Sequence, residues 1–265
     1  MRLREERVKK PFLIFTPNPE IAVLASMDKE FRNVLNSADL LLPDGIGLVQ
    51  AKKFLELPNS SNKILRPFLL FGQGFIVGIA TFIKKDWLFE SLYPIKGREM
   101  FLEFIKLANK KGWKVFLLGG GRNVADKSAD FLRKTFKKVE IIAASGPNLD
   151  KNGLPVKKED ERIQKQVIKE INDFKPQLLF VAFGAPKQER WLYKWRAKLK
   201  IGGAMAVGGT FDYISGCAKP PPSWMGDLGL EWLWRLIREP QRAGRIFTAF
   251  PIFPLKIFWY KLNAS

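Results

Sequence analysis

Short, almost entirely apolar runs, separated by segments with helical periodicity, constrain this chain of 265 residues more than any other feature. The runs do not alternate with polar residues, which is typical of strands buried on both faces of a parallel sheet. They are Phe12–Phe15, Asp39–Pro43, Lys114–Leu118, Val139–Ala143, Leu178–Ala182 and Ala204–Val207. The alternation predicts an α/β fold, a Rossmann-like doubly wound and mostly parallel sheet covered by helices on both faces.

The helices between these runs have recognisable starts. Asn18 suits the N-cap of a helix and Pro19 its first position, so we expect a helix to about Ser26 and another from Asp28 to about Asn36. Residues 157–174 have the pattern of a charged amphipathic helix.

We expect two domains: an α/β core over residues 1–222 and a helical, basic and aromatic C-terminal appendage over residues 223–265. The core contains an apolar insertion at residues 58–95. Within it, the seventeen residues from Pro67 to Ile83 carry no charge. A membrane span needs about 20 residues, so the segment is either a buried hairpin or core helix, or an element that enters a membrane or its interface.

The composition excludes several chemistries. The chain has no His and one Cys, Cys217, which rules out Ser-His-Asp and Cys-His catalysis, His-ligated metals and disulfides within the chain. Proton transfer would fall to Asp, Glu, Lys or Tyr. The basic start of the chain, residues 1–10, lacks the apolar segment of a secretory signal peptide, so we expect no export.

The net charge of +19 predicts an anionic partner. Nucleic acid, an anionic membrane surface and phosphorylated ligands all fit. Trp and Phe interleaved with Lys and Arg suit stacking on single-stranded nucleic acid and also an interfacial membrane element. Composition leaves these alternatives open.

Loops after the predicted strands are the candidate ligand site, because doubly wound sheets bind ligands at the carboxyl ends of their strands. Several contain glycine, which lets backbone amides approach a phosphate, and helices follow them. We therefore expect a nucleotide-type pocket. Residues 119–124 do not complete the dinucleotide fingerprint and no Walker A sequence occurs, which disfavours a dehydrogenase or a P-loop ATPase.

Asp44 is the leading candidate for a general base. It follows an apolar run, and burial at the end of a strand would raise the pKa of its carboxyl toward general-base use. The alternative is that Asp44 caps the next helix, and Asp212 has the same ambiguity. Residues 187–189 either form a solvated first helical turn or line a ligand.

Six blocks, in order, resemble the WecG/TagA/CpsF glycosyltransferases. They span roughly Phe12 to Arg245 and read TPNPE at 16–20, LPDGIG at 42–47, FLLGG at 116–120, GAPKQE at 184–189, GGTFD at 208–212 and GLEWL at 229–233.

The resemblance implies transfer of an N-acetylmannosamine-type sugar, with inversion, from a UDP donor to undecaprenyl-diphosphate-linked N-acetylglucosamine. It implies Asp44 as the base, with Thr16 beside it in the catalytic pair. The substrate-binding residues would be Asn18, Gly45, Gly47, Gly119, Gly120, Gly184, Ala185, Pro186, Lys187, Gln188, Glu189, Gly208, Gly209, Phe211 and Asp212. Arginines of the appendage, Arg235, Arg238 and Arg242, would neutralise the leaving UDP and the lipid diphosphate.

The same resemblance implies no metal and no other cofactor, no nucleic-acid partner, and work at an anionic membrane surface on the cytoplasmic face of a bacterial plasma membrane. A homo-oligomer is compatible with it. This chain departs from the family pattern in its shortened N-terminal region, in its apolar insertion, which displaces an arginine usually found before the Gly97 block, and in an aromatic tail from Lys256. A catalytically impaired relative and a nucleic-acid-binding protein are the alternatives.

Overall fold

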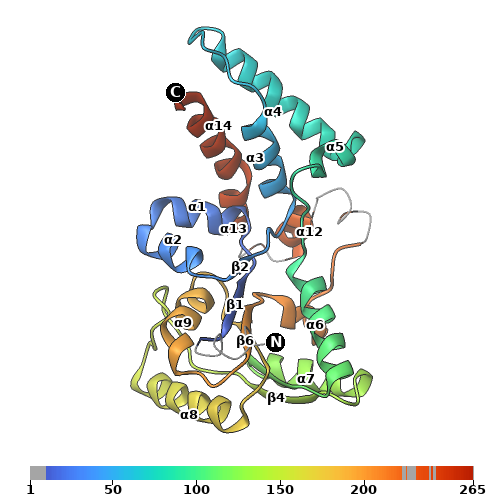
Figure 1. Cartoon of the computed structure of the whole chain (residues 1–265), viewed down its shortest axis with the longest axis vertical. Helices are drawn as coiled ribbons and strands as arrows, with labels where there is room; N and C mark the ends of the chain where they lie inside the picture. The colour runs from blue at the N-terminus through green and yellow to red at the C-terminus, as the bar shows by residue number, and fades with distance from the viewer. Residues whose placement is uncertain (1–9, 223–224, 226–230, 239, 241–242, 265) are drawn as a thin grey trace, which may run out of the picture. The chain divides into compact units, whose positions relative to one another are not determined.

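The computed structural model describes residues 10–222, 225, 231–238, 240 and 243–264 (Figure 1). Its sheet has six parallel strands in the order β2-β1-β6-β5-β3-β4. The strands are β1 (Phe12–Phe15), β2 (Leu40–Leu41), β3 (Lys114–Gly119), β4 (Glu140–Ala144), β5 (Leu178–Ala182) and β6 (Gly203–Ala206). The predicted α/β parallel fold is confirmed. β2 is shorter than its apolar run because only Leu40 and Leu41 pair with β1.

The chain divides into two compact units, which we call the sheet unit and the helical unit. The sheet unit contains Met1–Thr16, Lys29–Leu42 and Gly97–Lys219, and the helical unit contains Pro17–Asp28, Pro43–Lys96 and Pro220–Ser265. The expected appendage, residues 223–265, thus falls in the helical unit together with two earlier segments. The division occurs directly after β1 and β2, at Thr16 and Leu42.

Helices flank the sheet of the sheet unit on both faces. They are α2 (Lys29–Asn36), α6 (Gly97–Lys111), α7 (Val124–Thr135), α8 (Lys158–Phe174), α9 (Lys187–Trp195), the short η2 (Arg196–Lys198) and α10 (Thr210–Ile214). Figure 1 shows α8 and α9 on one side of the strands and α6 and α7 on the other. The core between these layers is aromatic: the Phe101 ring lies 4.7 Å from that of Phe180 and 5.9 Å from that of Phe211, centroid to centroid. Burial of these rings fixes α6 and α10 on the sheet.

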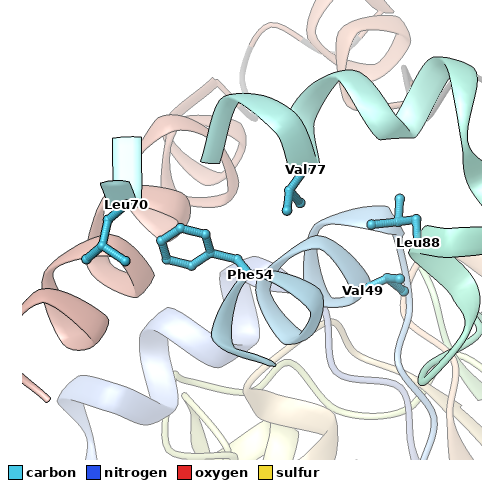
Figure 2. Close-up of a cluster of buried hydrophobic side chains, with 5 residues drawn as sticks. All are labelled: Val49, Phe54, Leu70, Val77 and Leu88. Carbon is cyan, nitrogen blue, oxygen red and sulfur yellow. The ribbon is translucent and has the colours of Figure 1, made fainter. Parts of the chain in front are cut away.

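The helical unit has its own apolar core. Its helices are α1 (Pro19–Met27), α3 (Ile46–Glu56), α4 (Arg66–Ile83), α5 (Lys85–Phe89), α12 (Glu231–Arg238), α13 (Ala243–Phe247), η4 (Thr248–Ile252) and α14 (Phe253–Asn263). Figure 2 shows a cluster in which side chains from α3, α4 and α5 meet: Val49, Phe54, Leu70, Val77 and Leu88. Residues of α14, among them Phe258, pack against it.

A buried lysine joins α14 to α3 and α4. Lys261 is 4% exposed, and its Nζ donates hydrogen bonds to the carbonyl oxygens of Phe54 and Leu57 and to Oε1 of Gln73. Burial lowers the pKa of this ammonium group. At the same end of α14, the Arg66 guanidinium donates to the carbonyl oxygens of Leu262 and Ala264. The last turn of α14 is thus held by hydrogen bonds to residues far away in sequence.

The uncharged segment Pro67–Ile83 forms most of the single helix α4. It is therefore neither a hairpin nor a fully buried core helix. Among the described residues, α4 is the one helix long and apolar enough to cross a membrane by length and composition, with a mean hydropathy of 1.5 and 28% of its residues buried.

Candidate active site

Four neighbouring strands of the sheet unit carry sequence-predicted site residues at their carboxyl ends. In the order β1, β6, β5 and β3, these are Thr16, the loop from Gly208, the loop from Gly184 and the Gly119–Gly120 turn. Because the strands are parallel, their carboxyl ends lie at one edge of the sheet. The strand order therefore brings these loops to one edge of the sheet, as predicted.

Gln188 connects two of these loops. Its Oε1 accepts hydrogen bonds from the backbone N–H of Gly184 at 3.2 Å and of Gly208 at 3.1 Å, and its Nε2 donates to Oε1 of Glu189 at 2.8 Å. Gln188 is 3% exposed and Glu189 is 1% exposed. These two side chains lie beneath the loops, so their geometry suits positioning of the loops rather than contact with a ligand.

The glycines of the edge serve two purposes. At the end of β3, a Cβ on Gly119 would lie 2.9 Å from the Ala182 backbone, and one on Gly120 would lie 3.0 Å from the Val124 side chain. Glycine is required there for packing. Gly184 and Gly208 also have positive φ values, +77° and +53°, but a Cβ at either would meet nothing within 4 Å. The backbone of these two loops is therefore open to an approaching group.

Three helices begin at this edge. α7 follows the Gly119–Gly120 turn, α9 begins at Lys187 directly after Ala185 and Pro186, and α10 begins at Thr210 after Gly209. The N-terminus of a helix carries a partial positive charge and backbone N–H groups that point out of the helix. Together with the open loops, these ends can donate hydrogen bonds to the phosphate oxygens of a nucleotide.

Thr16 and Phe211 are buried in the sheet unit. The Thr16 hydroxyl donates to the carbonyl oxygen of Ala206 at 3.3 Å and so links the ends of β1 and β6. The Phe211 ring is 1% exposed and belongs to the aromatic core. Phe211 can therefore affect binding only by holding α10 in position. Its neighbour Asp212 is partly exposed.

Arg98 is a candidate that the sequence did not single out. Its guanidinium lies 5.1 Å from the ring centre of Tyr213, the residue after Asp212. Arg98 is one of 45 basic residues, and only the packing of α6 against α10 brings it to this loop. A guanidinium here could bind an anionic group.

The helical unit holds Asp44 in a tight pair of loops. The backbone N–H of Asp44 donates to the carbonyl oxygen of Pro17 at 2.8 Å, and a Cβ on Gly47 would lie 2.8 Å from Cγ of Pro19. Gly45, with φ of +95°, precedes the first turn of α3. The Asp44 residue is partly exposed.

Asn18 caps α1 as predicted. Its Oδ1 accepts a hydrogen bond from the backbone N–H of Ile21 at 2.9 Å, and Pro19 occupies the first turn. If Asn18 also binds substrate, as predicted, it would do so with the NH₂ group of its side chain. A further contact of this loop was not foreseen from the sequence: the Arg245 guanidinium donates to Oε1 of Glu20 at 2.7 Å.

The predicted phosphate-neutralising arginines are only partly described. Arg238 is exposed, and its guanidinium lies 4.8 Å from the ring centre of Trp234. Arg235 lies on α12, and Arg242 lies outside the described residues. Glu231, the first residue of α12, pairs with Lys96 at 3.6 Å. Within the described residues, no group of three or more acidic or Cys side chains could hold a metal ion, and metal independence stays a prediction.

Comparison with known proteins identifies the family. The model of the glycosyl transferase WecG/TagA/CpsF family matches residues 2–64 and 84–265. The chain belongs to this family. The resemblance seen in its six sequence blocks is confirmed, and the enzyme class is that of a glycosyltransferase. The family model leaves out residues 65–83, which contain the whole of α4.

Curated relatives cover most of the chain. An N-acetylglucosaminyldiphosphoundecaprenol N-acetyl-beta-D-mannosaminyltransferase of Bacillus subtilis (strain 168) is 29% identical over 95% of this chain and 80% of its own length. Proteins with the same name in Bacillus spizizenii and in Staphylococcus aureus (strain MW2) are each 28% identical, over 90% and 92% of this chain. Their own lengths are covered to 76% and 78%.

Proposed function

We propose that this glycosyltransferase moves an N-acetylmannosamine-type sugar from a UDP donor to undecaprenyl-diphosphate-linked N-acetylglucosamine, with inversion at the anomeric carbon. The proposed UDP-sugar site rests on one observation: two open glycine loops and three helix N-termini lie at the same edge of the sheet unit. This arrangement suits a nucleoside diphosphate. The names of the relatives support the acceptor and the sugar type.

In the proposed reaction, Asp44 takes the proton from the acceptor hydroxyl. The hydroxyl oxygen forms a bond to the anomeric carbon while the bond from that carbon to the UDP oxygen breaks, and UDP leaves with the electron pair. An inverting displacement requires base and leaving group on opposite sides of the anomeric carbon. The negative charge that develops on UDP would be stabilised by Arg235, Arg238 and Arg242 and by helix N-termini.

Most of the other predicted residues fall into two groups according to their exposure. Gly184, Ala185, Pro186, Lys187, Gly208, Gly209 and Asp212 are partly exposed at the loops and would contact the donor. Thr16, Gln188, Glu189 and Phe211 are buried and would hold those loops in place. Arg98 joins the first group in this proposal.

We propose further that the enzyme works peripherally on the cytoplasmic face of the membrane, where a polyprenyl-linked acceptor is embedded. The net charge of +19 supports attraction to anionic lipid. This would serve synthesis of a cell-surface polysaccharide or teichoic acid.

A transfer assay tests the proposal. The purified full chain, UDP-N-acetylmannosamine and undecaprenyl-diphosphate-N-acetylglucosamine in detergent should give a disaccharide-lipid and free UDP, with the β configuration of the new linkage read by NMR. A panel of other UDP-sugars serves as the control for donor choice. UDP release with none of the sugars would favour a catalytically impaired relative, and retention of configuration would contradict the displacement described above.

A further inference from the structure

The outward face of α4 is an exposed apolar surface that the proposed reaction does not use. Large apolar side chains that are exposed line this face along the whole helix: Phe68, Leu69, Phe71, Phe75, Ile76, Ile79, Phe82 and Ile83. Phe68 is 76% exposed and Phe75 is 64% exposed. Eight such side chains on one helix form a patch of the kind that marks an interaction surface.

The opposite face of α4 is buried in the helical unit. Residues at helical spacing, Leu70, Gln73, Val77, Ala80 and Thr81, point inward. Gln73 donates to the carbonyl oxygen of Pro58 and accepts from Lys261, and Thr81 accepts from Nε2 of Gln50. α4 is therefore a helix fixed along its length, with one apolar face left outside.

The ends of the apolar face are basic. Lys63 and Arg66 lie at the start of α4, and Lys84 and Lys85 follow its last residue. No acidic residue lies between positions 57 and 85. An apolar stripe with basic residues at both ends complements the acyl chains and phosphates of an anionic bilayer.

We propose that α4 is an in-plane membrane anchor, which lies along the bilayer surface with its outward face among the acyl chains. The inference rests on the proposed function only in that the acceptor of that reaction is a membrane lipid. The 18 residues of α4 give a contact of about 27 Å along the surface. Since the family model leaves out residues 65–83, this anchor is an addition to the part of the chain that the family shares.

The packing of α4 argues against a transmembrane position. Its inward face contacts α3, whose Lys52 and Glu56 are exposed and paired with each other at 2.6 Å. Gln73, Lys261 and the paired Lys53 and Glu90 lie in the same helical unit. A helix that crossed the bilayer in this packing would draw charged groups into the hydrocarbon, which is costly. In-plane insertion leaves these groups on the aqueous side.

Vesicle flotation of matched variants tests the anchor. In the double variant Phe75→Gln/Ile79→Gln, both altered side chains are on the outward face, so the fold should be retained. We expect its partitioning onto phosphatidylcholine–phosphatidylglycerol vesicles to fall by about tenfold or more for each side chain withdrawn from lipid. The control Leu107→Gln/Phe131→Gln alters two exposed apolar residues of α6 and α7 and should float as the unaltered protein does. Equal flotation of both double variants would overturn the proposal.

The orientation is tested with single thiols in full-length protein. In a Cys217→Ser background, Lys63→Cys and Lys84→Cys place a thiol near each end of α4, and Phe75→Cys places one at its centre. On the outside of vesicles, an impermeant maleimide should modify positions 63 and 84 but not position 75. Modification at only one end would show a helix that crosses the bilayer and would overturn the in-plane position. Light scattering tests whether a second copy of the chain covers this face instead. If the unaltered protein has the mass of two chains, the Phe75→Gln/Ile79→Gln variant has the mass of one, and flotation is unchanged, the face is a dimer interface and the anchor is overturned.

A water-soluble acceptor with a short prenyl chain separates this inference from the proposed function. The α4 variant should release UDP with this acceptor at the rate of the unaltered protein, and should lose turnover only when the acceptor is embedded in vesicles. If the unaltered protein floats but never transfers sugar, the proposed function fails and the anchor stands. If transfer to the soluble acceptor is normal and flotation does not depend on α4, the anchor fails alone.

Discussion

Single side chains in this enzyme hold loops that the sequence describes only as glycine-rich. Gln188 is the clearest case, because one amide oxygen accepts hydrogen bonds from Gly184 and Gly208, the loops after β5 and β6. From the sequence, Gln188 is a polar residue at a helix start, equally suited to solvent or to a ligand. Its partner Gly208 is 20 residues away, and only the pairing of the two strands brings them together.

Replacing Gln188 tests whether its hydrogen bonds to the loops after β5 and β6, the Gln188 bridge, stabilise the fold. Gln188→Leu removes the acceptor of two backbone N–H groups, so the free energy of unfolding should fall by about 2 kcal/mol or more. In urea denaturation, the control Gln166→Leu, on the exposed face of α8, should change the unfolding free energy by less than about 0.5 kcal/mol. Equal stability of the two variants would show that the bridge contributes nothing.

Lys261 has the same kind of importance in the helical unit. Lys261→Ala would leave three acceptors, in Phe54, Leu57 and Gln73, without their donor, and we expect a loss of about 2–4 kcal/mol in unfolding free energy. Lys256→Ala changes an exposed lysine of the same helix and should be nearly neutral. Hydrogen exchange of α14 amides would report the loosening directly, and unchanged protection in Lys261→Ala would contradict it.

At the scale of elements, the sequence predicted the strands well because they are apolar runs, and those of β3, β5 and β6 are buried on both faces. The ends of β4 and β6 each differ from the prediction by one residue, since backbone pairing rather than hydropathy decides where a strand stops. The burial of α4 could not be predicted in the same way. An uncharged run with three glycines has no period that separates a core helix from an exposed one, and its burial depends on α3, α5 and α14.

The contact between α1 and α3 gives an element-scale prediction. In Gly47→Ala the new Cβ would lie 2.8 Å from Cγ of Pro19, in a rigid ring, so α1 and α3 must separate and the unfolding free energy should fall by about 1–3 kcal/mol. Gly72→Ala in α4 meets nothing within 4 Å and should stabilise the helix by roughly 0.5–1 kcal/mol. Thermal unfolding of the pair gives the comparison, and a shift of the same sign in both would contradict the packing argument.

At the scale of the whole molecule, a net charge of +19 and an apolar face on α4 predict membrane binding with two components. Charge attraction to anionic vesicles should weaken as salt rises from about 0.1 M to 1 M, because the Debye length falls from about 10 Å to 3 Å. Contact of α4 with acyl chains should persist. Flotation in high salt should therefore be reduced but not abolished, whereas complete release would mean that charge alone holds the protein.

The candidate site was predicted from sequence only in part. Parallel strands bring the loops after β1, β6, β5 and β3 to one edge, so their convergence was predictable from the alternation of elements. The burial of Glu189 and Phe211 was not, because loop motifs do not reveal which of their side chains turn into the core. Arg98 and Arg245 were missed since a chain with 45 basic residues gives no local signal for two of them.

Loss of the Asp44 carboxylate tests the proposed mechanism most directly. Asp44→Asn keeps the size of the side chain but removes the base, so kcat for transfer should fall roughly 10²- to 10⁴-fold while the Kd for the UDP-sugar stays unchanged. Asp86→Asn, an exposed aspartate on α5, serves as the matched control and should transfer normally. Normal turnover by Asp44→Asn in a folded protein would contradict the account.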